Sequence, residues 1–287
     1  MPELPEVQTI IDDLNKIVLN KEIKKVEICL SKIVRCDNKD FSAVLKNSSF
    51  KKISRLGKFI IIQLSKKDKY LIIHLRMTGQ IIYIDKEKVI VGGHSVGNNQ
   101  LDLPNKQTHL IICFQDQSKL FYNDQRQFGF WQVANCKQLK EVQDKLGLNP
   151  LHAEFNLSSF KSLLENRKGN IKSFLLNQKH IAGLGNIYTN ESLFKAHILP
   201  SRKINTLTIK EIEKLLKSIK DILNLSIEYR GTTFNNYLDA EGRKGKFIKF
   251  LKVYKKENQK CSKCQKGIIR KVKIAGRGTR YCHYCQK

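Results

Sequence analysis

Two Cys-x-x-Cys pairs near the C-terminal end constrain the fold of this chain more than any other feature. Cys261 and Cys264 form the first pair, Cys282 and Cys285 form the second, and seventeen residues separate the two. Each pair can bring two sulfur atoms of one tight turn to a tetrahedral ion, and two such turns complete a four-cysteine structural zinc site. Redox-active pairs are the alternative, and they do not come twice at this distance. The spacing predicts a β-hairpin zinc ribbon over residues 257–287 with one structural Zn²⁺.

The remaining cysteines and the hydropathy pattern indicate a soluble chain without disulfides. No stretch approaches the roughly 20 unbroken apolar residues of a membrane helix. The N-terminus lacks the basic start and apolar run of a signal peptide. In such a chain eight cysteines argue against a disulfide framework. Four of them lie scattered in apolar or mixed segments, and we expect them to be ordinary buried thiols: Cys29, Cys36, Cys113 and Cys136.

The charge balance favours a polyanionic partner. The formal net charge is +27, from 53 Lys and Arg residues against 26 Asp and Glu residues. The excess is strongest over residues 241–287, which hold 16 Lys and Arg residues against two Asp and Glu residues. A field of this size attracts nucleic acid and makes binding salt-dependent. A solvated lysine-rich surface is the alternative that charge alone leaves open.

The periodicity of apolar residues predicts an α+β multidomain chain. A helix is expected close to the N-terminus because Pro5 suits a first helical turn and is followed by apolar residues at helical spacing. Segments rich in Ile, Val, Phe and Tyr predict an N-terminal β-sandwich or flattened barrel. They lie near 22–31, 49–65, 70–85, 107–123 and 128–134, and 92–107 is expected to be a long loop.

Helices are expected after this β-rich part. We expect Ser158 to cap a helix that runs to about residue 166, and Asn170 to cap another through Gln178. Thr208 and Glu211 have the spacing of a capping box before a third helix. The expected domains are the N-terminal β-sandwich domain 1–135, a linker 136–156, a helical domain 157–256 and the zinc ribbon 257–287.

The N-terminal Met1–Pro2 pair offers unusual chemistry. Methionine before a small residue is normally removed, which would leave Pro2 as a free secondary amine. An α-amino group titrates well below lysine, so much of it is neutral and nucleophilic near pH 7. Its attack on a sugar C1′ gives an iminium, an electron sink of the Schiff-base kind. Glu3 and Glu6 could protonate the opening sugar ring or the departing base. The alternative is a plain helix start.

The sequence resembles the formamidopyrimidine-DNA glycosylases along nearly its whole length. The similarity is carried by seven motifs in the family's order. They are PELPEV at 2–7, RLGKFI at 55–60, HLRMTG at 74–79, YNDQRQFG at 122–129, LLNQKHIAGLGNIYTNESLF at 175–194, RGTTFNNYLDAEGRKG at 230–245 and AGRGTRYCHYC at 275–285. The resemblance implies a helix–two-turn–helix domain after the β-sandwich, a lesion-capping loop over 230–245, and DNA in a basic cleft between the domains.

The resemblance also implies roles for individual residues. Pro2 matches the Schiff-base nucleophile and Glu3 the proton donor in base excision. Lys58 matches the residue that aids base loss and β-elimination. Arg277 matches the arginine that grips phosphates beside the lesion and is linked to δ-elimination. Further matches to DNA contacts are expected at Glu6, His74, Gln107, His109, Arg167, Lys172 and Asn186, where His74 could equally satisfy a buried backbone group.

Three residues suit the extrusion of a base from duplex DNA. Met77 is the only methionine besides Met1, and its flexible thioether can fill an emptied stack. Phe128 can wedge between bases, and Arg126 can hydrogen-bond the base left unpaired. Core burial is the alternative for Met77 and Phe128, but both lie in polar turn sequences.

The match departs from the family pattern at four positions. Gln125 stands where Pro is usual, Gln127 where a second basic residue is usual, and Gln107 where a DNA-contacting histidine is usual. Arg230 replaces the usual Gly at the start of the capping loop. The first three affect backbone contacts at most, whereas Arg230 bears on the conformation of the capping loop and so on the lesion range.

The resemblance implies a bifunctional enzyme of base-excision repair. It would excise oxidised purines such as 8-oxoguanine and formamidopyrimidines, and then cleave the strand by β,δ-elimination through Pro2. We expect a cytoplasmic, nucleoid-associated monomer that binds double-stranded DNA with damaged bases or abasic sites and binds no membrane. One alternative is an endonuclease VIII-like glycosylase for oxidised pyrimidines. Others are a non-catalytic zinc-ribbon nucleic-acid binder and a catalytically inactive relative.

Overall fold

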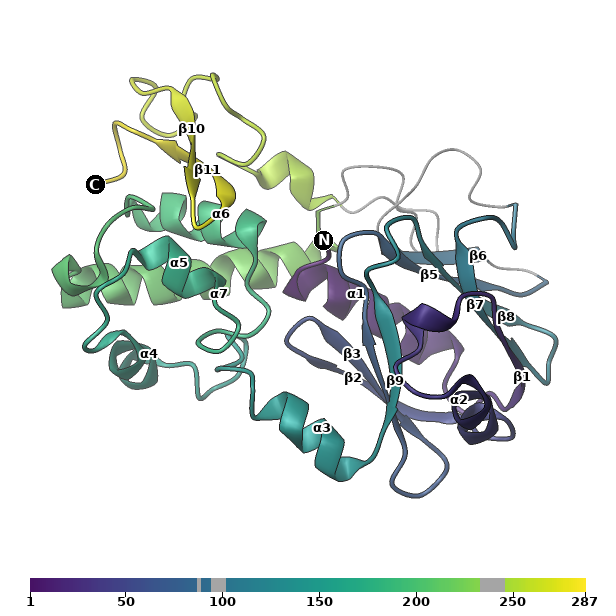
Figure 1. The fold of residues 1–287 in the computed structure, drawn as a ribbon. Helices are drawn as coiled ribbons and strands as arrows, with labels where there is room; N and C mark the ends of the chain where they lie inside the picture. The colour runs from purple at the N-terminus through teal and green to yellow at the C-terminus, as the bar shows by residue number, and fades with distance from the viewer. Residues whose placement is uncertain (87–88, 94–101, 233–245) are drawn as a thin grey trace. The chain divides into compact units, whose positions relative to one another are not determined.

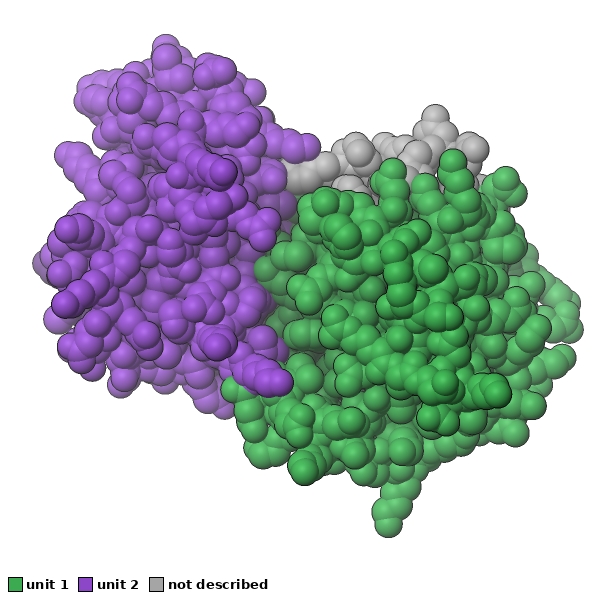
Figure 2. Space-filling model, viewed as in Figure 1, with its two compact units in different colours: residues 1–144, 229–248 green, residues 145–228, 249–287 purple. Residues whose placement is uncertain are grey.

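The structure is a computed structural model that describes residues 1–86, 89–93, 102–232 and 246–287 (Figure 1). Within it the chain divides into two compact units, each made of two segments (Figure 2). Unit 1 comprises Met1–Asp144 and Tyr229–Ile248, and unit 2 comprises Lys145–Glu228 and Lys249–Lys287. The segment Tyr229–Ile248 therefore belongs with the N-terminal part, whereas the expected helical domain 157–256 included it. Most of the expected capping loop lies at 233–245, outside the described residues.

Unit 1 opens with the expected helix, α1 (Leu4–Ile17). Pro5 lies in its first turn, where a missing N–H has no helical partner to lose. Glu3 is the N-cap and forms a capping box with Glu6. The apolar stripe of the helix, including Val7 and Ile10, is buried in the core of the unit. The expectation of a helix at the chain start is confirmed.

Two antiparallel sheets form the body of unit 1, as expected for a sandwich (Figure 1). The first has the order β1-β7-β8-β5-β6 and the second the order β2-β3-β4-β9. The strands are β1 (Ile23–Ile28), β2 (Phe50–Leu56), β3 (Phe59–Leu64), β4 (Tyr70–His74), β5 (Gly79–Ile84), β6 (Val89–Gly93), β7 (Thr108–Phe114), β8 (Lys119–Asp124) and β9 (Phe130–Ala134). The unit also holds α2 (Asn38–Leu45), α3 (Cys136–Gln143) and the 3₁₀ helix Ser31–Ile33, and the 3₁₀ helix Phe247–Phe250 spans its boundary with unit 2.

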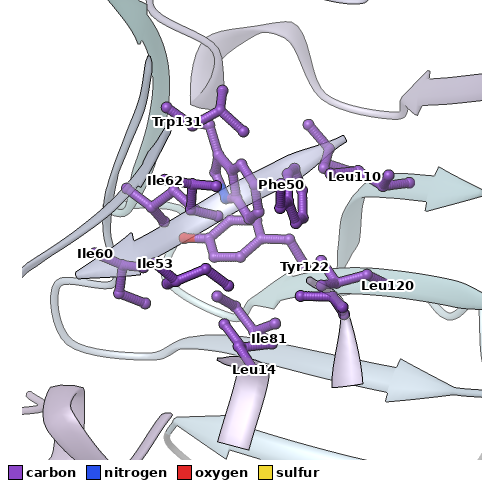
Figure 3. Packing of buried hydrophobic residues seen from close by; sticks show 14 of the residues in the cluster. Leu14, Phe50, Ile53, Ile60, Ile62, Ile81, Leu110, Leu120, Tyr122 and Trp131 are labelled. Atoms are coloured by element: carbon purple, nitrogen blue, oxygen red, sulfur yellow. The ribbon is translucent and has the colours of Figure 1, made fainter. Parts of the chain in front are cut away.

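One hydrophobic core draws on both sheets (Figure 3). Phe50 comes from β2, Tyr122 from β8 and Trp131 from β9, and all three are buried. The rings of Tyr122 and Trp131 meet with centroids 5.6 Å apart and planes at 70°. An edge-to-face pair of this kind adds about 0.5–1.5 kcal/mol to the gain from burial. Side chains of alternate strand residues thus join the two sheets into a single layer of packing.

Unit 2 is helical up to its last segment. Its helices are α4 (Leu157–Leu164), α5 (Ile171–Leu176), α6 (Asn186–Ala196) and α7 (Ile209–Glu228), with the 3₁₀ helix Ile204–Thr206. Asn170 caps α5 as expected, because its Oδ1 accepts from Ser173 N at 2.8 Å. The capping box of Thr208 and Glu211 is also confirmed, with N–H···O distances of 2.8 and 3.3 Å. The cap of α4 is Asn156 and not Ser158.

A β-hairpin of β10 (Ile269–Ile274) and β11 (Arg277–Cys282) ends unit 2. Ala275 and Gly276 form its two-residue turn with φ of 51° and 70°. Two positive φ values are the signature of the type I′ turn that suits a tight hairpin, and a glycine adopts the second without cost. A buried carboxylate holds the preceding segment: Glu191 accepts from the backbone N–H groups of Lys252, Val253 and Tyr254 at 2.8–3.0 Å.

Two further expectations need correction. Cys29, Cys36 and Cys136 are exposed and Cys113 is only half-buried, so these thiols do not fill the core. Cys29 and Cys36 lie in bends outside the helices and strands, Cys136 is the first residue of α3, and Cys113 is the second-last residue of β7. Composition alone does not reveal these placements. The expected linker 136–156 contains a full helix, α3, capped by Asn135. Among the described residues, no helix combines the length and apolarity that crossing a membrane requires.

Candidate active site and nucleic-acid interface

The chain start is fixed by paired carboxylates. Pro2 is buried, and Glu3 is only 3% exposed. Glu6 Oε2 accepts from Glu3 N at 2.9 Å, while Glu6 Oε1 accepts from both N and Oγ1 of Thr232 at 2.8 and 2.9 Å. Glu6 thus holds the helix start on a segment more than 200 residues away in sequence. Met1 is present here, so Pro2 N is an amide and becomes an amine only when Met1 is removed.

Gly231 makes this approach possible. Its φ is +76°, and an added Cβ would lie 2.9 Å from Glu6 Oε1. Glycine alone combines that backbone conformation with that proximity at no steric cost. The preceding Arg230 also has positive φ, and its guanidinium donates to both oxygens of the buried Asp13 carboxylate at 2.6–2.7 Å. The family departure at Arg230 is therefore held by an ion pair to α1.

Lys58 lies in the two-residue turn between β2 and β3, after Gly57 at φ 58°. It is 6% exposed, and its charge acts on the nearby imidazole of His74. His74 Nδ1 accepts from Arg76 N at 2.9 Å. The ring thus satisfies a backbone N–H group, which is one of the two roles expected for it. Burial, followed by the charges of Arg76, Lys58 and Arg35, lowers the pKa of His74 to about 3. The imidazole is neutral at pH 7, and the tautomer with the proton on Nε2 fits its acceptor role.

Two arginines that the sequence analysis missed, Arg35 and Arg76, lie near His74. The Arg35 guanidinium sits 3.2 Å from the ring centroid of Phe130, and that of Arg76 sits 5.9 Å from it. Burial, and then the charge of Arg76, lowers the pKa of Arg35. Arg76 stands inside the HLRMTG motif, whereas no sequence signal pointed to Arg35. Together with Lys58 these groups form a cationic cluster suited to an anion.

The three residues expected to occupy the gap in the duplex come together on the surface. Met77 is 38% exposed and Phe128 is 53% exposed, so neither is a core residue. Arg126 Nη1 lies 2.9 Å from Met77 Sδ, and its guanidinium lies 4.7 Å from the ring centroid of Phe128. An exposed aromatic ring, a thioether and a guanidinium thus form one apolar-cationic patch, as an interface to stacked bases requires.

Gln107 and His109 lie behind this patch. Gln107 is half-buried, and its carbonyl accepts from Asp124 N at 3.0 Å. His109 is 4% exposed, and its Nε2 lies 2.8 Å from the carbonyl oxygen of Asp124. Both residues support the end of β8 here, and their DNA contacts stay predictions.

The helical unit carries the remaining expected contacts. Lys172 is fully buried, and its ammonium donates to Asn190 Oδ1 at 2.8 Å and to Thr279 Oγ1 at 2.7 Å. The structure shows it as an internal cross-link between α5, α6 and β11, so its phosphate contact stays a prediction from resemblance. Asn186 begins α6 and donates to Gly278 O at 3.0 Å. Arg167 is exposed in the loop before α5.

The four ribbon cysteines form one cluster. The sulfur atoms of Cys261, Cys264, Cys282 and Cys285 all lie within 4.8 Å of one another. Backbone N–H groups, first that of Gly267, lower the pKa of Cys264 to about 6, which favours the thiolate that binds a metal. Burial and the neighbouring sulfurs raise the pKa of Cys285 and so disfavour its thiolate. A bound divalent cation would stabilise that thiolate and lower the pKa. The donor set fits tetrahedral Zn²⁺.

Arg277 stands at the tip of the same hairpin. It is exposed and follows Gly276 directly at the start of β11. An added Cβ on Gly276 would meet no heavy atom within 4 Å among the described residues, so the turn leaves room for another molecule. The hairpin that carries this arginine is fixed by the cysteine cluster, which includes Cys282, and by the hydrogen bond from buried Lys172 to Thr279.

Known proteins match this chain over its whole length. Two family models match it: the formamidopyrimidine-DNA glycosylase N-terminal domain over residues 1–131 and the formamidopyrimidine-DNA glycosylase H2TH domain over residues 146–237. The formamidopyrimidine-DNA glycosylases of Ureaplasma parvum and Carboxydothermus hydrogenoformans are each 38% identical to it, with all of both chains covered.

Solved structures agree with the sequence comparison. A Lactococcus lactis Fpg mutant in complex with Fapy-dG-containing DNA is 33% identical with a TM-score of 0.88, and both chains are covered completely. The Lactococcus lactis Fpg in complex with abasic-site DNA is 32% identical with a TM-score of 0.87 over 99% of each chain. The two family models and these relatives, which match the chain from end to end, lead to one conclusion. The chain belongs to the formamidopyrimidine-DNA glycosylase family.

Proposed function

We propose that this protein is a bifunctional base-excision enzyme that removes oxidised purines, including formamidopyrimidines and 8-oxoguanine, from duplex DNA. The observation that carries the proposal is the fixed chain start, where Pro2 and Glu3 are buried and the carboxylate of Glu6 accepts from the backbone N–H of Glu3. A terminal amine gains catalytic use only when it is held in one orientation toward a substrate atom. Relatives in complex with Fapy-dG and abasic-site DNA support the same substrate class.

The chemistry would run through the Pro2 amine once Met1 is removed. The amine nitrogen attacks C1′ and the bond from C1′ to the damaged base breaks, so that the base leaves with the proton that the amine gives up. The C1′–O4′ bond of the sugar then opens to an iminium, and Glu3 donates a proton to O4′. The resulting iminium withdraws electrons from the neighbouring C2′–H bond. The Glu3 carboxylate left by the first step takes the C2′ proton, and the 3′ phosphate leaves from C3′ with the bonding electrons by β-elimination. Lys58 assists these steps in the proposal, and Arg277 assists loss of the 5′ phosphate by δ-elimination.

The zinc site would serve structure and not reaction. Cys261, Cys264, Cys282 and Cys285 would hold one Zn²⁺, and all four tetrahedral positions would be filled by sulfur. A closed site of this kind supplies folding energy and offers no position for a substrate. Its contribution to function is to keep Arg277 at the hairpin tip.

Borohydride trapping tests the enzyme proposal. Protein without Met1 is expected to become covalently attached to 8-oxoguanine DNA, and peptide mapping is expected to place the adduct on Pro2. A matched sample that retains an N-terminal extension is expected to bind the duplex without forming the adduct. Absence of any adduct with trimmed, DNA-binding protein would contradict the proposal and favour a non-catalytic binder.

The substrate panel includes an oxidised pyrimidine. The Lactococcus lactis relative has been crystallised in complex with oxidised-pyrimidine DNA, so that class is a specific second candidate. Single-turnover rates on 8-oxoguanine, a formamidopyrimidine and an oxidised pyrimidine rank the candidates directly. We expect the two purine lesions to be excised faster, and the reverse order would favour an endonuclease VIII-like activity.

A further inference from the structure

The carboxylate of Asp124 ties together the two turns that carry the exposed patch residues. Asp124 is the last residue of β8 and is completely buried. Its Oδ2 accepts from Gly129 N at 2.8 Å and from Tyr122 OH at 3.2 Å. Its Oδ1 accepts from Arg126 N at 3.2 Å and forms a short hydrogen bond with Thr78 Oγ1. One buried side chain therefore serves four donors.

These bonds fix both ends of a single loop. The N–H groups of Arg126 and Gly129 converge on one carboxylate, and between them the chain turns outward through Gln127 at φ 55°. Arg126 and Phe128, the two patch residues on this loop, lie within the stretch 126–129 that Asp124 binds at both ends. A loop held at both ends loses little conformational entropy when it meets a ligand, which is the basis of preorganised recognition.

The turn that carries Met77 is bound to the same carboxylate, through Thr78. Thr78 follows Met77, and its hydroxyl oxygen also accepts from Arg126 N at 3.0 Å. The space around the carboxylate is filled: an added Cβ on Gly129 would lie 1.9 Å from Tyr122 Oη. Met77 and Arg126, 49 residues apart in sequence, are thus set relative to each other by Asp124 and Thr78.

We propose that Asp124 is a positioning residue for opposite-base selection, acting by holding Arg126 in the orientation that reads the orphaned base. The proposal rests on the proposed function and deepens it. The orphaned cytosine offers the adjacent acceptors O2 and N3 to a guanidinium fork, whereas adenine presents one acceptor beside a donor. That discrimination depends on the direction of the fork, and Asp124 sets the backbone from which the fork projects.

The test compares four single variants with wild type, together with Arg126→Ala alone and combined with Asp124→Asn. Asp124→Asn replaces one acceptor oxygen by an NH₂ group that cannot accept from a backbone N–H. Thr78→Val removes the hydroxyl that bridges the carboxylate and Arg126 N while keeping the branched shape, and Thr78→Ser restores that hydroxyl. Asp116→Asn is the matched control, because Asp116 lies in the turn at the other end of β8 and pairs with Lys21.

Single-turnover excision of 8-oxoguanine opposite cytosine and opposite adenine gives the decisive ratio. We expect Asp124→Asn and Thr78→Val to lower the cytosine-to-adenine ratio, toward the loss of about 5- to 150-fold that a missing bidentate contact produces. Thr78→Ser and Asp116→Asn are expected to keep the wild-type ratio. The double variant Asp124→Asn/Arg126→Ala is expected to match the ratio of Arg126→Ala alone, because both changes remove one contact.

A purely structural role gives a different pattern. Equal loss of rate on both duplexes with an unchanged ratio, or a double variant whose ratio is the product of the two single effects, would overturn the proposal. If Asp124→Asn does not fold, Thr78→Val decides the question. If wild type forms no adduct and excises nothing, the proposed function fails by itself. Equilibrium binding to a stable abasic-site analogue opposite cytosine or adenine then decides the role of Asp124 by the same ratio.

Discussion

Acidification should destabilise unit 1 through one buried imidazole. His74 is 7% exposed, and its pKa is lowered to about 3 in the folded protein. In the unfolded chain the pKa of a histidine is about 6.5. Between these two values the unfolded state binds the proton and the folded state does not, so stability is complete above pH 6.5 and falls as pH decreases.

The size of the effect follows from the two pKa values. At pH 5 the unfolded imidazole is 1.5 pH units below its pKa, which corresponds to a loss of up to about 2 kcal/mol relative to pH 7.5. His74→Asn keeps an acceptor near the Nδ1 position for Arg76 N but cannot be protonated in this range. The variant is therefore expected to show a pH dependence smaller by that amount.

Urea unfolding at pH 7.5 and pH 5.0 measures the effect. Trp131 is the only tryptophan of the chain and lies in the core of unit 1, so its fluorescence reports the unit that contains His74. The informative quantity is the difference in free energy of unfolding between the two pH values, compared between wild type and variant. Equal differences in the two proteins would refute the assignment of a neutral, protonation-resistant imidazole.

Three further outcomes are expected. Glu191→Gln should cost about 1–3 kcal/mol in thermal or urea unfolding, because one of the three backbone donors to this buried side chain then faces an NH₂ group; the exposed Glu213→Gln is its control. Cys282→Ser should release zinc and expose the hairpin to protease, and folded, active wild type without zinc in metal analysis would contradict the assignment. Arg277→Ala should weaken binding to damaged and undamaged duplex alike and reduce the log–log salt slope by about 0.9, whereas an effect confined to damaged DNA would speak against a phosphate contact.

Local signals carried most of the prediction of the fold. The Thr208–Glu211 box and the Asn170 cap act within four residues, so the sequence displays both partners together. The same kind of signal marks α3, where Asn135 and Gln138 form a capping box at the start of the segment expected to be a linker. The helix is polar overall and none of its residues is buried, which is why the hydropathy pattern did not reveal it.

Long-range contacts explain what the sequence could not show of the site. Lys172 reads as an exposed phosphate ligand until Thr279, 107 residues later, encloses its ammonium. Asp124 received no role from the sequence, where it is one polar residue of the YNDQRQFG motif, and only the fold brings Thr78 and Gly129 to its carboxylate. Motifs thus identified which residues gather at the surface, whereas the buried partners that orient them depend on the packing of distant segments.

The two-segment construction of unit 1 bears on the order in which the molecule can be completed. Glu6 and Thr232 are 226 residues apart, and Asp13 and Arg230 are 217 apart. Contacts of such sequence separation form late, because the chain between them must first be synthesised and its ends brought together. The N-terminal helix is made first on the ribosome, yet its anchors at residues 230–232 emerge only after most of unit 2. The proposed nucleophile, Pro2, is therefore in the first part of the chain to be made and among the last to be fixed in place, so an incomplete nascent chain carries the proline without the support that orients it.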